Sequence, residues 1–76
     1  MTDDERLQQL IDSAEAAYDR LYEAHGDIEA TSCYSEAKEN LYDAIQLARK
    51  LGLTEKVRGL HARLDHIKAV FRSQFS

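Results

Sequence analysis

The chain has 76 residues, of which 43% are hydrophobic and 32% charged, with three glycines, no proline and a formal net charge of −4. This length allows one small domain, and the composition excludes a disordered or loop-rich chain. It also argues against a membrane-spanning helix, because that requires about 20 consecutive apolar residues and no apolar run here approaches that length.

The charge is distributed unevenly along the chain. Residues 1–38 carry ten acidic and three basic side chains, giving −7, whereas residues 39–76 carry four acidic and seven basic ones, giving +3. Two interpretations follow from this division. Either acidic and basic helices face each other within the fold, or they form charged surfaces for a partner.

The first 24 residues have the pattern of an amphipathic helix. Apolar residues recur at alternate spacings of four and three, which places them on one face: Leu7, Ile11, Ala14, Tyr18 and Leu21. Thr2 is a suitable N-cap, with Glu5 three residues later, and His25-Gly26 is a suitable C-terminal end. The pattern therefore predicts a helix over Asp3–Ala24.

A second helix is expected to end before Gly52, with Arg49 in its last turn, where cations are favoured. Its start stays open between Asp27 and Tyr34. Asp27 could cap the helix at once, or Ser32 could start it, because Thr31-Ser32-Cys33 has poor helix propensity. We expect a break near Gly26–Ser32. From Tyr34 the apolar stripe is regular, with two further apolar residues beside it: Tyr34, Ala37, Leu41, Ala44, Ala48 and Leu51, flanked by Ile45 and Leu47.

A third helix is predicted after a break at Gly52–Leu53, with Thr54 as its N-cap. It carries the same spacing of apolar residues: Leu53, Val57, Leu60, Leu64, Ile67 and Phe71. Gly59 is its weak point, since an interior glycine costs about 1 kcal/mol relative to alanine. Such a glycine is also a candidate for a close contact between helices.

No segment alternates with the period of two that a strand requires, so the predicted fold class is all-α. Short connections make successive helices antiparallel, which gives a three-helix bundle or overlapping helical hairpins in one domain over residues 1–76. The expected core consists of seven residues: Leu7, Ile11, Leu41, Ala44, Leu60, Leu64 and Ile67. Truncating Leu64 to alanine should cost about 2–5 kcal/mol.

Two stretches in the middle of the chain resemble the tetratricopeptide-type helical hairpin. Residues 21–30, LYEAHGDIEA, are similar to the turn of that repeat, where Gly-Asp follows the first helix. Residues 43–52, DAIQLARKLG, resemble the end of its second helix and the step into the next repeat. The resemblance covers under half of the chain, and it implies stacked antiparallel helices that bind proteins.

The side chains that could support chemistry lack the necessary spacing. Cys33 is the only cysteine, so no disulfide forms within the chain. His61 and His66 are five residues apart, whereas a two-histidine site on a helix uses a spacing of four. We therefore expect no enzymatic activity, metal, cofactor or small-molecule substrate, and a melting temperature that a chelator leaves unchanged.

A protein partner, or a second copy of the chain, is the expected ligand. Tyrosine is enriched at binding hot spots, and four tyrosines lie on two successive predicted helices: Tyr18, Tyr22, Tyr34 and Tyr42. At the end of the third helix, apolar residues with basic neighbours form a second candidate surface: Lys68, Val70, Phe71, Arg72 and Phe75. The lysine and arginine there would meet the acidic first helix of another chain.

A nucleic-acid-associated regulator using the basic third helix is the alternative function, although the acidic chain would repel phosphates. A phosphotransfer role for His61 has the least support, because the residues after it do not match such a domain. A single cysteine, without a basic start followed by an apolar core, favours the reducing cytoplasm. The prediction is therefore a small, non-enzymatic cytoplasmic adaptor, regulator or chaperone-like partner.

Overall fold

The computed structural model describes residues 2–75, except for the side chain of Phe75. It contains helices α1 (Asp3–Glu23), α2 (Asp27–Lys50) and α3 (Thr54–Phe75), and no strand occurs in the described residues. The all-α prediction with three packed helices is thereby confirmed. None of the helices in this range combines the length and apolar character that crossing a bilayer requires.

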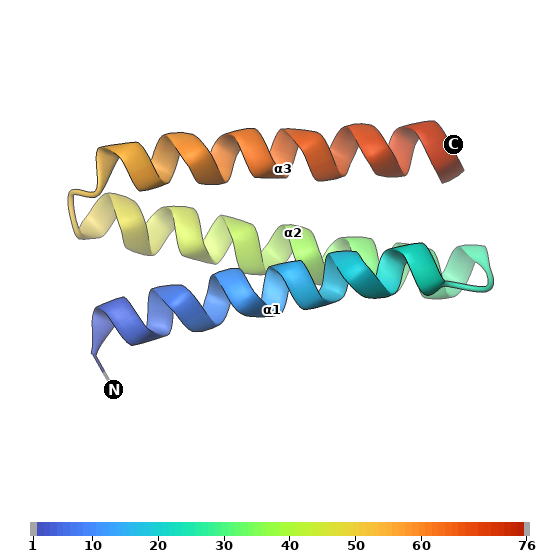
Figure 1. The fold of residues 1–76 in the computed structure, drawn as a ribbon, viewed down its shortest axis with the longest axis horizontal. Coiled ribbons are helices and arrows are strands. Elements are labelled where there is room, and N and C mark those ends of the chain that lie inside the picture. The colour runs from blue at the N-terminus through green and yellow to red at the C-terminus, as the bar shows by residue number, and fades with distance from the viewer. Residues whose placement is uncertain (1, 76) are drawn as a thin grey trace.

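The three helices form a flat layer whose Cα atoms span 38 × 23 × 13 Å. Figure 1 shows α3 running alongside α2, while α1 crosses α2 and continues in the same direction as α3. Helix α2 packs against both neighbours, whereas α1 and α3 approach each other much less closely. The connection between α1 and α2 therefore lies at the same end of the layer as the end of α3 (Figure 1).

The ends of α1 follow the sequence closely. The Thr2 hydroxyl accepts a hydrogen bond of 3.2 Å from the Glu5 backbone N–H, which confirms the predicted N-cap. The helix ends at Glu23, and Ala24 then takes an extended conformation. Gly26 is also extended, so this connection makes no use of a left-handed glycine.

Helix α2 begins at Asp27, so the predicted break over Gly26–Ser32 is wrong beyond its first residue. Ala30 is fully buried and Cys33 nearly so, and both belong to the core. Helical geometry is what turns these two small residues to the same face. The burial of that face therefore outweighs the poor intrinsic propensity of the segment.

The connection between α2 and α3 is a Schellman motif around Gly52. The Leu53 N–H donates to the Ala48 carbonyl at 2.9 Å, and the Gly52 N–H donates to the Arg49 carbonyl at 3.0 Å. Gly52 has a φ of 74°, where a side chain is strained. Helix α3 starts at Thr54 itself, one residue earlier than a capping role for this threonine would give.

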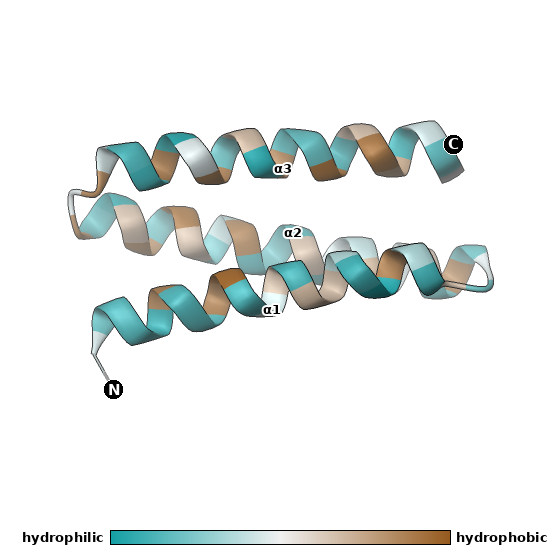
Figure 2. Ribbon diagram, in the orientation of Figure 1, coloured by the Kyte–Doolittle hydropathy of each residue, from teal (hydrophilic) through white to brown (hydrophobic). Residues whose placement is uncertain are grey.

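The core confirms six of the seven predicted residues, and Ile11 is the exception because it is only partly buried. Ile45, which lies beside the predicted stripe, is 2% exposed. It is buried because α2 lies in the middle of the layer and must cover two neighbours rather than one. Figure 2 shows apolar and polar residues alternating along all three helices, as amphipathic packing requires.

Gly59 and Gly52 are expected to respond oppositely to alanine. A Cβ atom at Gly59 would meet nothing within 4 Å, and its φ is not positive. Gly59→Ala should therefore stabilise the fold by roughly 0.5–1 kcal/mol through helix propensity. Gly52→Ala should destabilise it by about 1–2 kcal/mol, because of the left-handed backbone. Urea denaturation of both variants measures this, and a destabilising Gly59→Ala would contradict it.

Candidate functional site

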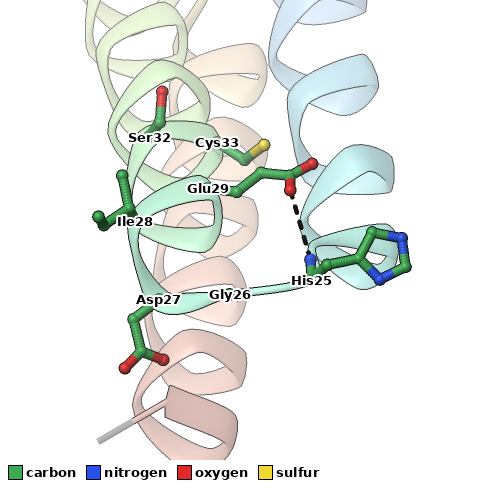
Figure 3. A pocket seen from close by; sticks show the side chains of 7 residues that line it. All are labelled: His25, Gly26, Asp27, Ile28, Glu29, Ser32 and Cys33. Carbon is green, nitrogen blue, oxygen red and sulfur yellow. Dashed lines mark hydrogen bonds between the residues drawn. The ribbon is translucent and has the colours of Figure 1, made fainter.

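A shallow, open depression lies at the connection between α1 and α2 (Figure 3). Inside it, the Glu29 carboxylate accepts a 3.4 Å hydrogen bond from the His25 backbone N–H. Ile28, on its rim, points away from α1 and is 89% exposed. Across the described residues no three His, Cys, Asp or Glu side chains are grouped to hold a metal, and Cys33 is a buried free thiol.

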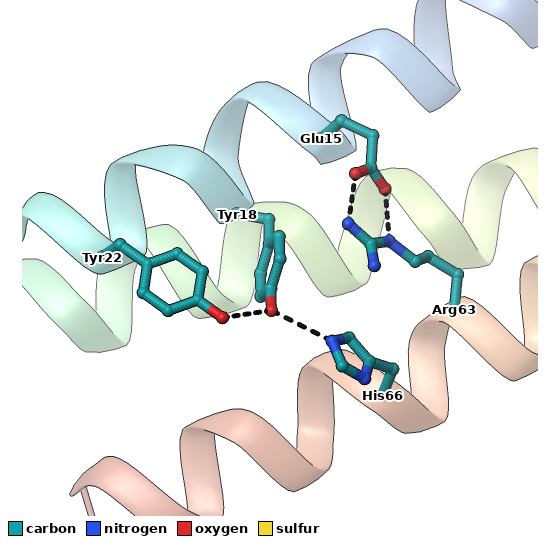
Figure 4. A network of polar contacts seen from close by, with 5 residues as sticks. All are labelled: Glu15, Tyr18, Tyr22, Arg63 and His66. Carbon is teal, nitrogen blue, oxygen red and sulfur yellow. Dashed lines mark hydrogen bonds and ion pairs between the residues drawn. The ribbon is translucent and has the colours of Figure 1, made fainter.

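A polar network joins α1 to α3 (Figure 4). The hydroxyls of Tyr18 and Tyr22 share a hydrogen bond of 2.6 Å, and the Tyr18 hydroxyl also lies 3.2 Å from His66 Nε2. Tyr18 is 5% exposed. Burial, followed by the hydrogen bond to Tyr22, raises the pKa of Tyr18 to about 12, so its phenol is neutral at physiological pH.

A fork of two hydrogen bonds lies beside this network. The Arg63 guanidinium donates to both carboxylate oxygens of Glu15, through Nε at 2.7 Å and through a terminal nitrogen, and this contact raises the pKa of Arg63. The same guanidinium lies 4.7 Å from the centre of the Tyr18 ring. The polar groups of these residues are hydrogen-bonded to one another, and the network connects α1 to α3.

A row of basic and aromatic side chains follows the boundary between α2 and α3 on the outside of the molecule. We call this surface the basic seam and define it by five residues: Lys38, Tyr42, Arg49, His61 and Lys68. Arg49 donates to His61 Nε2 at 3.2 Å, and the Lys68 ammonium lies 5.5 Å from the centre of the Tyr42 ring. A hydrogen bond to Tyr42 raises the pKa of Lys68, so this lysine stays positively charged.

Aromatic stacking supports one end of the basic seam. The rings of Tyr34 and Phe71 stack with centres 3.9 Å apart and planes inclined by 4°. The Lys38 ammonium lies 4.4 Å from the centre of the Tyr34 ring. A flat pair of rings between α2 and α3 therefore holds a positive charge at the surface, where a cation–π contact contributes about 0.5–1 kcal/mol.

The outer side of α1 carries the opposite charge. Four exposed acids lie along the face that points away from the core, and we call them the acidic ridge: Glu5, Asp12, Asp19 and Glu23. Asp12 accepts a hydrogen bond from Gln8 at 2.8 Å. Within residues 2–75, neither the ridge acids nor Lys38 and Lys68 take part in an ion pair.

The predicted tyrosine cluster is divided between two surfaces. Tyr18 contacts α3 and is hydrogen-bonded to the exposed Tyr22, whereas Tyr34 and the exposed Tyr42 contact α3 from α2. The structure thus brings the second pair, and not the first, together with Lys68 and Phe71.

The predicted residues at the end of α3 are placed in different ways. Phe71 and Val70 are partly buried and pack against the core, so Phe71 is largely accommodated within the chain. Arg72 is exposed, one turn beyond Lys68. The side chain of Phe75 lies outside the described residues.

Sequence reasoning missed Lys38, Arg49 and His61 as members of a surface. A signal for them was present, because Lys38, Tyr42 and Arg49 are separated by four and seven residues and so lie on one side of a helix. Which side of α2 faces solvent beside α3, however, depends on how the helices pack.

No known protein family, curated protein or solved structure matches the chain. Two unpaired sets of opposite charge and exposed aromatic edges can form an interface with another macromolecule.

Proposed function

We propose that the protein is a non-enzymatic helical interaction module that binds an acidic helical segment of a protein on the basic seam. The observation that carries the proposal is the row of unpaired lysines against tyrosine rings along the α2–α3 boundary. Tyr42, which is 44% exposed, offers the kind of aromatic side chain that dominates interface energies.

The shape and chemistry of the seam support a helical ligand. Its side chains come from two neighbouring helices, and a third helix can pack against such a pair with the same packing rules. Arg49 and Lys38 lie eleven residues apart on α2, about 16 Å, so the seam matches roughly three turns of a bound helix. Asp65 is an acid near Lys68, and its negative charge partly offsets the positive charge of the seam.

A defined peptide tests the proposal. The probe is an alanine-based helical peptide with glutamates at positions i, i+7 and i+11, and its control carries lysines at the same positions. In an NMR titration, we expect the glutamate peptide to shift the amide resonances of Lys38, Tyr42 and Lys68, and the lysine peptide to leave them unchanged.

Charge reversal on the protein provides the matched control. The seam variant Lys38→Glu/Lys68→Glu should weaken peptide binding at least about tenfold, because it replaces attraction with repulsion. The variant Lys50→Glu/Lys56→Glu changes the net charge equally but lies outside the seam, so binding should be retained. Equal losses in both variants, or no binding by the wild type, would overturn the proposal.

Nucleic acid is the competing ligand, since lysines interleaved with tyrosines also suit a single strand. Binding of a single-stranded oligonucleotide with a steep dependence on salt, without binding of the acidic peptide, would favour that alternative. The net negative charge repels the closely spaced phosphates of a nucleic acid more strongly than the few carboxylates of a helical segment, which favours the protein ligand.

The resemblance to the tetratricopeptide hairpin supports protein binding by stacked antiparallel helices. The free buried thiol of Cys33 suits a reducing compartment, so we include a cytoplasmic location in the proposal.

A further inference from the structure

We infer that the acidic helix bound by the basic seam is α1 of a second copy of this chain, which lays its acidic ridge along the seam. The inference rests on the proposed function and names the partner. It is based on the acidic ridge and the basic seam of the same molecule, which carry opposite charge and have matching spacings along their helices.

The two rows have the same spacing. Along the seam, the first positive centre is Arg49 at His61, the next is Lys68 at Tyr42, and the last is Lys38. The α2 residues at these centres are Arg49, Tyr42 and Lys38, which are separated by seven residues and then by four. In distance this is about 10.5 Å followed by about 6 Å.

The ridge repeats these intervals. Asp12 and Asp19 are seven residues apart, and Glu23 follows four residues later. If α1 of a second copy runs parallel to α3, three of the four ridge acids each face one positive centre. Asp12 then meets Arg49, Asp19 meets Lys68, and Glu23 meets Lys38.

The chain cannot make these pairs within itself. Figure 1 shows α1 and α3 on opposite sides of α2 through most of the length of α1. The exposed ridge residues lie on the side of α1 opposite its buried residues, so they face neither of the other helices. The bound α1 would run in the same direction as the molecule's own α1. Between the acids it presents Ala16, an exposed small residue that allows close approach to the exposed edge of Tyr42.

The expected complex is weak and depends on salt. The ridge face carries no large apolar side chain, so long-range charge attraction provides more of the interaction than apolar burial does. Ridge and seam are different surfaces, so the contact is heterologous and each bound copy still presents a free surface to the next.

Sedimentation of the full chain tests the inference. At about 20 mM salt the weight-average mass should rise with protein concentration into the hundreds of micromolar, and at about 500 mM salt the rise should disappear. The ridge variant Asp19→Lys/Glu23→Lys and the seam variant Lys38→Glu/Lys68→Glu should each remain monomeric. Circular dichroism of every variant checks that the helices are retained.

The decisive sample is an equimolar mixture of the two reversed variants. The ridge variant carries a basic ridge, and the seam variant carries an acidic seam, so the mixture should regain association that neither shows alone. The variant Lys50→Glu/Lys56→Glu should associate like the wild type. A mixture without recovery, or a wild type that is monomeric throughout at low salt, overturns the inference.

The acidic peptide distinguishes this result from a failure of the proposed function. If the seam binds the glutamate peptide while the wild type stays monomeric, a second copy is excluded as the ligand. The ligand is then an acidic helix of another protein. Loss of both peptide binding and self-association removes both proposals.

Discussion

Leu41→Ala is expected to lower the free energy of unfolding by about 2–5 kcal/mol, from the lost burial and the cavity that remains. Leu41 is 0% exposed and lies near the middle of α2, the helix that packs against both neighbours. Small domains have a total stability of about 5–15 kcal/mol, so this change removes a large share of it. Urea denaturation followed by circular dichroism gives the value.

Ile28→Ala is the control for Leu41→Ala, because it removes a similar amount of apolar side chain at a position that is 89% exposed. Its effect should stay within about 0.5 kcal/mol. A cost at Ile28 equal to the cost at Leu41 would contradict the assignment of the core.

Stability is expected to fall steeply above pH 10 because of Tyr18. Its pKa is about 12 in the folded chain against an ordinary value of 10.0, so the native state disfavours the phenolate. Below pH 10 both states bind the proton and the contribution of Tyr18 is fully present. Between pH 10 and 12 the unfolded chain ionises first, which removes roughly 2–3 kcal/mol of stability.

Denaturation at intervals from pH 8 to pH 12 measures this alkaline loss. In Tyr18→Phe the loss should be smaller by about that amount, since the ionising group is gone while the other tyrosines and the lysines are unchanged. Tyr22→Phe should keep most of the loss, because burial is the largest cause of the Tyr18 shift. Parallel curves for wild type and Tyr18→Phe would contradict the role of Tyr18.

The helices and most of the core could be predicted because they depend on the local spacing of apolar residues and on capping residues. The spacing of Leu7, Leu41 and Leu64 with their neighbours defined one apolar face for each helix, and Thr2 and Gly52 ended those faces with known capping chemistry. The start of α2 could not be predicted in this way. Propensity disfavoured Ser32, and burial of Ala30 and Cys33, a tertiary effect, decided the outcome.

The candidate surface depended on the packing even more. The sequence by itself determined four tyrosines, an acidic first half and a basic second half, each on amphipathic helices. Only the tertiary structure decided that Tyr18 joins the α1–α3 network, while Tyr42 meets Lys68 and Tyr34 stacks on Phe71 at the α2–α3 boundary. Helical periodicity fixes which residues share a side of one helix, but the rotation and order of the helices decide which sides meet, and those follow from burial of the whole core.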